Sequence, residues 1–154
     1  MDRSEALQTL LRQYRDKAKK ALELYLHSAR RVSSFDLNVL KTPEDLEPYD
    51  ALAERFERAV EITLNPLLKS IELAETGASS ETIRDKLNLA AKLNLIDDVD
   101  LWLEMRAVRN RIAHDYLPER IQTVQDLLRT RYREEIEKFI PRLENYLKKR
   151  GFLP

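Results

Sequence analysis

Glycine is almost absent from this chain. Only Gly77 and Gly151 occur among 154 residues, whereas alanine, leucine, glutamate, lysine and arginine, which favour helices intrinsically, are abundant. In the long segments, apolar residues recur at mixed spacings of three and four, which is the period of an amphipathic helix. The sequence therefore predicts an all-α fold.

Breaks in the apolar pattern divide the chain into helices. The predicted spans are Asp2 to Arg31, about Pro48 to Thr76, Glu81 to Leu93, Val99 to Tyr116, and Arg120 to Arg150. Short loops join them, so the most economical arrangement is an antiparallel up-and-down bundle of four main helices plus a short extra helix. A length of 154 residues fits a single domain, 1–154.

Cap residues and prolines mark where helices begin and bend. Residues 42–45 (Thr-Pro-Glu-Asp) supply an N-cap, a proline at the first helical position and acids in the first turn. Pro66 predicts a kink or a local opening, because proline removes a backbone donor, and Pro141 predicts a second bend. The other predicted N-caps are Ser79 or Ser80 for the short helix and Asp97 or Asp98 for the helix that follows.

Composition limits the chemistry that the chain can perform. The 27 basic and 27 acidic side chains cancel, so any contact with nucleic acid is expected to be local. The absence of cysteine excludes disulfides and thiolate chemistry, and two histidines, His27 and His114, make a multi-histidine metal site unexpected. We therefore predict neither a metal nor another cofactor. Without a leader-like start or a long apolar run, the sequence predicts a cytoplasmic protein with no membrane partner.

Residues 109–116, Arg-Asn-Arg-Ile-Ala-His-Asp-Tyr, combine groups suited to phosphate chemistry and are called the motif segment below. Arginine keeps a fixed charge on a planar donor fork that matches phosphate oxygens. Histidine, with an unperturbed pKa of about 6.5, exchanges protons near neutrality. A lone histidine near a helix end is also typical of a structural role, so His114 gains its interest from the company of Arg109, Asn110 and Tyr116.

Metal-free RNA cleavage needs a general base, a general acid and positive charge near the phosphate. One histidine cannot act as base and acid at once, so His114 predicts a homodimer in which two chains share a cleft. Arg109 and His114 lie about 140° apart on an ideal helix, so the arginine must reach around the helix or meet its partner across the interface. Asn110, four residues before His114, can orient the imidazole.

Two nearby side chains have more than one interpretation. Trp102 lies off the core stripe of its helix, so it packs either in a dimer interface or against another helix of the same chain. Arg106 lies one turn before Arg109 and contacts either an RNA phosphate or a carboxylate, Asp98 or Glu104.

The motif segment resembles the Arg-x4-His-x-Tyr signature of HEPN domains, specifically the HepT-type toxins encoded beside a minimal nucleotidyltransferase antitoxin. The region from Ser80 to Met105 also resembles that family's short helix, acidic turn and aromatic-bearing helix. The resemblance implies a dimeric helical bundle that cuts RNA without metal. It further implies Arg109 and His114 as ribonuclease residues, Asn110 as the polar residue after the arginine, and Tyr116 as the residue AMPylated by the partner nucleotidyltransferase.

The function expected from this resemblance is a metal-independent endoribonuclease toxin whose partners are RNA, a second copy of the chain and a nucleotidyltransferase antitoxin. The alternative is a catalytically weak HEPN binding module that serves a nucleotidyltransferase as a partner or substrate-binding subunit.

Overall fold

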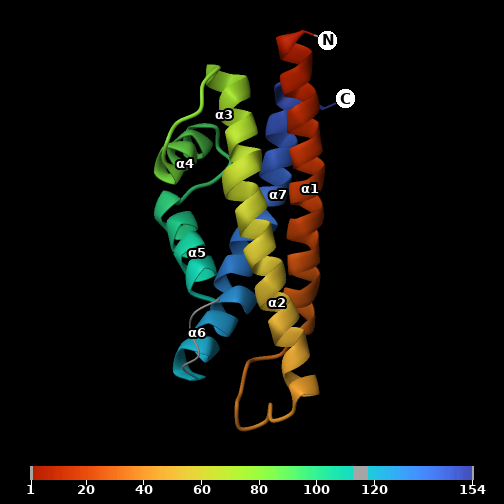
Figure 1. Cartoon of the computed structure of the whole chain (residues 1–154), viewed down its shortest axis with the longest axis vertical. Coiled ribbons are helices and arrows are strands. Elements are labelled where there is room, and N and C mark those ends of the chain that lie inside the picture. Colours follow the sequence, from red (N-terminus) through yellow and green to blue (C-terminus); the bar gives the residue numbers. More distant parts are fainter. Residues whose placement is uncertain (1, 113–117, 154) are drawn as a thin grey trace.

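The computed structural model describes residues 2–112 and 118–153, and helices are the only regular elements in these two ranges (Figure 1). In chain order they are α1 (Arg3–Arg31), α2 (Pro43–Ile62), a π-helical turn called the π segment (Thr63–Leu67), α3 (Leu68–Thr76), α4 (Ile83–Lys92), α5 (Val99–Ile112), α6 (Pro118–Arg129) and α7 (Arg131–Lys149). The all-α prediction is confirmed.

The helices form four antiparallel columns with the two chain ends close together (Figure 1). The first column is α1, the second is α2 continued through the π segment into α3, the third is α5, and the fourth is α6 followed by α7. The short α4 packs beside α3 and α5. This is the predicted bundle of four main helices with one short addition, in which α2 packs between α1 and α5 (Figure 1).

A single cluster of buried apolar side chains draws on every helix. At its centre the Phe56 ring stacks on Tyr132 and tilts against Tyr25, with ring centroids 5.5 Å apart in both pairs. Trp102 belongs to this core: its Nε1 donates to Glu135 Oε1 at 3.0 Å, and the side chain is fully buried within one chain. The dimer-interface interpretation of Trp102 is therefore wrong.

The second column begins at the helix start predicted from residues 42–45, and it is continuous with the long helix that was expected from about Pro48. Thr42 Oγ1 accepts from the Asp45 backbone N–H at 3.1 Å, and the Asp45 carboxylate accepts from the Thr42 N–H at 3.2 Å. This reciprocal capping box starts the helix at Pro43. Pro48 then lies inside α2, where it removes one backbone donor.

Pro66 produces the predicted local opening. It lies in the π segment, where the Leu68 N–H donates to the Thr63 carbonyl five residues earlier. A proline cannot donate to the carbonyl four residues before it, and a wider turn accommodates that missing bond. The second column therefore continues through the proline instead of ending there.

The fourth column breaks at Thr130 and not at Pro141, which stays inside α7. The Thr130 hydroxyl donates to the Asp126 carbonyl at 2.6 Å, a side-chain bond that competes with the backbone ladder and bends helices. The Thr130 backbone has φ −117° and ψ −83°, outside helical values. The break at Thr130 was not predicted, because a threonine hydroxyl, unlike a proline, gives no distinct signal in the sequence. A bend at Pro141, inside α7, stays a prediction.

The prediction for the C-terminal end of α3 is confirmed, whereas the prediction for the N-cap of α4 is wrong. Gly77 ends α3 in the left-handed conformation, φ 77°, as expected for a glycine after a helix. The cap of α4 is Thr82, whose Oγ1 accepts from the Asp85 N–H at 3.1 Å. Ser80, one of the two serines predicted to cap this helix, is instead engaged by the side chain of Glu72.

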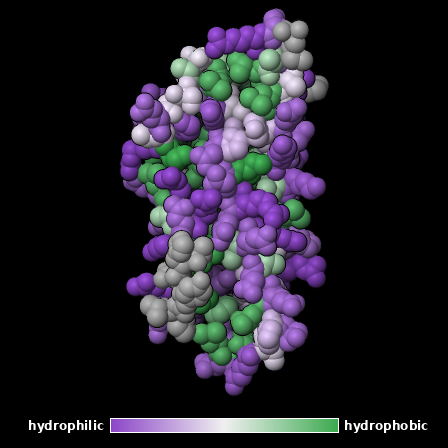
Figure 2. All heavy atoms as spheres, in the orientation of Figure 1, coloured by the Kyte–Doolittle hydropathy of each residue, from purple (hydrophilic) through white to green (hydrophobic). Residues whose placement is uncertain are grey.

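The surface in Figure 2 is mostly hydrophilic, with separate groups of apolar residues near its upper end, at its left side and at its lower end. Among the described residues, the exposed large apolar side chains are Leu37 and Val39, both in the loop between α1 and α2. None of the described helices is long and apolar enough to cross a membrane.

Candidate functional site

Arg109 lies in the last described turn of α5 and reaches across to α2. Its Nη2 is 2.8 Å from Glu61 Oε2, and its Nη1 donates to Asn110 Oδ1 at 2.9 Å. The Arg109 side chain is 32% exposed, and Asn110 is exposed. The guanidinium is thus held by oxygens of two neighbours while it remains accessible to solvent.

Two carboxylates of α2 set the electrostatic environment of Arg109. Glu61 pairs with it directly and also accepts from Asn65 Nδ2 at 2.9 Å through its second oxygen. Glu57 is one turn earlier; burial raises the pKa of its carboxyl above the usual range, against the opposing effect of the Arg109 charge. The arginine charge is therefore partly compensated within the chain.

His114 and Tyr116 lie outside the described residues. The predicted approach of Arg109 and of Asn110 to His114, the role of Tyr116 and the expected extension of the helix to Tyr116 accordingly stay predictions. What the structure brings together is Arg109 with Asn110, and Arg109 with an acidic face of α2.

Arg106 is exposed and forms no hydrogen bond or ion pair in the part of the chain that the structure describes. Both carboxylates considered for it have other partners. Glu104 accepts from the Tyr132 hydroxyl at 2.7 Å, and Asp98 caps α5 by accepting from the Leu101 N–H at 3.1 Å. The ion-pair interpretation of Arg106 is wrong, and its contact with an RNA phosphate stays a prediction.

The arginines around the break between α6 and α7 do not form a second cationic site. Each pairs with a carboxylate: Arg129 with Asp126, Arg131 with Glu104 and Arg133 with Glu137. Within residues 2–112 and 118–153, no three histidine, aspartate or glutamate side chains are grouped to hold a metal ion.

A cavity of about 220 Å³ lies between α2, α5 and α6, and its lining includes two residues of the motif segment and four of the helix that follows it. Arg111 and Arg120 supply charge to its wall, and Ile112 and Ile121 supply apolar surface. Gln125 also lines it; its Nε2 donates to the Tyr49 carbonyl at 3.1 Å, whereas its buried Oε1 accepts no hydrogen bond. The chain on both sides of residues 113–117 therefore contributes to one amphipathic hollow.

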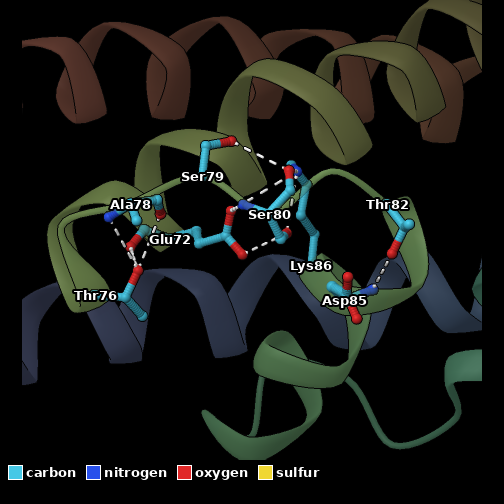
Figure 3. Close-up of polar contacts among 8 residues, drawn as sticks. All are labelled: Glu72, Thr76, Ala78, Ser79, Ser80, Thr82, Asp85 and Lys86. Atoms are coloured by element: carbon cyan, nitrogen blue, oxygen red, sulfur yellow. Dashed lines mark hydrogen bonds and ion pairs between the residues drawn. The ribbon is translucent and has the colours of Figure 1, made fainter.

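A separate polar cluster fastens the loop between α3 and α4 (Figure 3). The buried Glu72 carboxylate accepts from the N–H and hydroxyl of Ser80, both at 2.6 Å. The buried Lys86 ammonium donates to the Ser80 carbonyl at 2.5 Å and lies 3.7 Å from Glu72 Oε1. Burial raises the pKa of Glu72, but the Ser80 hydrogen bonds and the Lys86 charge lower it more, so the pKa lies below its usual range. Every partner in this cluster belongs to the loop or its two helices, which indicates a structural role.

Glu61 and Asn65 are the residues of this site that sequence reasoning missed. They stand four apart on α2 and the π segment, a spacing that places both on one helical face. Nothing in the sequence says that this face meets Arg109, about 45 residues further along the chain.

The comparisons with known proteins agree with the helical bundle. Residues 6–145 match the family model described as nucleotidyltransferase substrate binding protein like. A chain of the solved structure of the tri-AMPylated Shewanella oneidensis HEPN toxin in complex with MNT antitoxin is similar in fold, with a TM-score of 0.64 and 19% sequence identity. The similarity covers 88% of the present chain and 97% of the other. A comparison with curated proteins gave no match. The chain belongs to the family of nucleotidyltransferase substrate binding protein-like chains and has a HEPN-like fold.

Proposed function

We propose that this protein is a metal-independent endoribonuclease that acts as the toxin of a toxin–antitoxin pair. The observation that carries the proposal is the solvent-accessible Arg109, held in a defined orientation beside Asn110 at the start of the motif segment. The fold shared with a HEPN toxin adds support.

In the proposed reaction, His114 of one subunit removes the proton from a ribose 2′-hydroxyl, and the 2′-oxygen attacks the adjacent phosphorus. The bond from phosphorus to the 5′-oxygen breaks, and His114 of the second subunit gives that oxygen a proton. Arg109 stabilises the charge that develops on the phosphate oxygens. The products are a 2′,3′-cyclic phosphate and a 5′-hydroxyl, so no external reactant is needed.

The reaction requires a homodimer, because each chain supplies one histidine of the motif. A twofold axis near the end of α5 would bring two copies of Arg109 and His114 to one cleft. In this proposal Arg106, which is exposed one turn earlier on α5, contacts a neighbouring phosphate of the RNA.

RNA cleavage in EDTA tests the catalytic proposal. We expect purified wild-type protein to cut RNA under these conditions and to leave 2′,3′-cyclic phosphate ends. A matched His114→Ala preparation is expected to be inactive, whereas His27→Ala, which changes an exposed histidine of α1, should cut normally. Intact RNA with the wild type, or equal cutting by His114→Ala, would refute the assignment.

Tyr116 is proposed as the residue that a nucleotidyltransferase antitoxin AMPylates. A nucleotide added two residues from His114 brings bulk and negative charge to the cleft, which opposes RNA binding. After exposure to active nucleotidyltransferase and ATP, we expect wild type to lose RNA cleavage and Tyr116→Phe to retain it, measured on the same RNA. Equal inactivation of both proteins would contradict the proposal.

The family description favours one alternative, a binding module that presents a substrate to a nucleotidyltransferase. In that case a partner nucleotidyltransferase would bind the chain, but the wild type would leave RNA intact in EDTA. The cleavage experiment therefore separates the two functions.

A further inference from the structure

The Glu61 carboxylate connects the π segment to the arginine of the motif segment. One of its oxygens, Oε1, accepts from Asn65 Nδ2 at 2.9 Å, and the other, Oε2, lies 2.8 Å from Arg109 Nη2. Arg109 Nη1 in turn donates to Asn110 Oδ1 at 2.9 Å. Four side chains from three elements thus form one continuous chain of polar contacts that passes through the guanidinium.

This arrangement has little value as a source of stability. Arg109 and Glu61 are 32% and 46% exposed, and ion pairs at such accessible positions contribute little to folding. Its clearer effect is on orientation. A free arginine side chain samples many rotamers. Contacts at both terminal nitrogens of Arg109 instead fix the plane of its guanidinium before a ligand binds.

We propose that Glu61 is a positioning residue, which holds Arg109 with its donor groups set for the RNA phosphate, and that Asn65 fixes Glu61 in turn. This inference rests on the proposed ribonuclease function. A side chain that stabilises a transition state stabilises it less when the residues that orient this side chain are removed. Glu61 also offsets part of the arginine charge, so its removal is not expected to weaken RNA binding.

Steady-state cleavage of a defined RNA by the full-length protein tests the inference. We expect Glu61→Ala to lower kcat about tenfold without raising KM. Glu61→Gln keeps a carbonyl oxygen for Arg109 and should recover part of the loss. The control is Glu54→Ala, which breaks an exposed 2.7 Å ion pair with Arg58 on the same helix and should match the wild type. An unchanged kcat in Glu61→Ala, or a change confined to KM, would overturn the role.

A second measurement does not depend on catalysis. The side-chain nitrogen signals of Arg109 in NMR spectra should report restricted rotation in the wild type and in Glu54→Ala, and free rotation in Glu61→Ala. If Arg109 rotates freely in the wild type, Glu61 does not position it. If Arg109 is restricted but the wild type leaves RNA intact, the ribonuclease proposal fails while the restraint by Glu61 stands.

Discussion

Replacing Arg109 by alanine is expected to lower kcat for RNA cleavage by about 100- to 1,000-fold, the usual cost of removing one group that stabilises transition-state charge. The fold should survive, because the Arg109–Glu61 pair is partly exposed and contributes at most about 1 kcal/mol to stability. Single-turnover cleavage in EDTA together with thermal unfolding of the same samples measures both effects.

Two further variants make this result specific to the guanidinium. Arg109→Lys keeps the charge but loses the planar fork, so its rate is expected to fall between those of wild type and Arg109→Ala. Arg58→Ala removes a paired arginine from the exposed surface of α2 and should cut RNA like the wild type. If Arg58→Ala lost as much activity as Arg109→Ala, the loss would reflect general surface charge and not a site.

The largest expected effect on stability belongs to Glu72. Replacing it by alanine leaves the Lys86 ammonium buried without its counter-charge and leaves two donors of Ser80 unpaired. Breaking a buried ion pair in this way costs about 3–5 kcal/mol. Urea denaturation of Glu72→Ala and wild type near pH 7 measures the difference in the free energy of unfolding.

A matched exposed pair provides the control for burial. Arg84 and Asp100 join α4 to α5 at the same 3.7 Å separation but are 60% and 87% exposed. Asp100→Ala is therefore expected to cost less than about 1 kcal/mol. A cost for Glu72→Ala as small as that for Asp100→Ala would show that the cluster does not fasten the loop.

The contribution of Glu72 should also depend on pH. Its pKa in the folded protein lies below the usual glutamate value, so the stabilisation is complete above the unfolded pKa and is lost as the pH falls through the folded pKa. The stability difference between wild type and Glu72→Gln should accordingly shrink between about pH 7 and about pH 3. A difference that stays constant over this range would contradict the assignment.

Local chemistry explains why much of the fold was predictable from the sequence. The capping signal at residues 42–45, Gly77 after α3 and Pro66 each act on their own neighbourhood, and each has the effect expected of it. The wrong prediction for the cap of α4 has a different cause. Ser80 was expected to cap α4, but its hydrogen bonds go to Glu72, eight residues away and on another helix. Such competition between partners is decided by tertiary packing.

The candidate site was less predictable than the fold. Residue types and spacing identify Arg109 and Asn110 as neighbours, and the structure joins them by a hydrogen bond. The contact between Arg109 and Glu61 depends on how α5 docks on α2, which periodicity does not specify. Trp102 shows the same limit, because its buried partner Glu135 is 33 residues away in the chain.

The π segment contains one residue more than an α-helical turn would. This extra residue sets how far α3 is rotated about the helix axis relative to α2. A turn closed over five residues shifts everything beyond it by about 100° relative to an uninterrupted α-helix. Glu61 precedes this shift and faces Arg109, whereas Glu72 follows it and faces Lys86. Deleting one residue here would restore an uninterrupted α-helix. One of these carboxylates would then face away from its partner. The π segment that contains Pro66 thus sets the relative direction of two carboxylates that lie on either side of it in the second column.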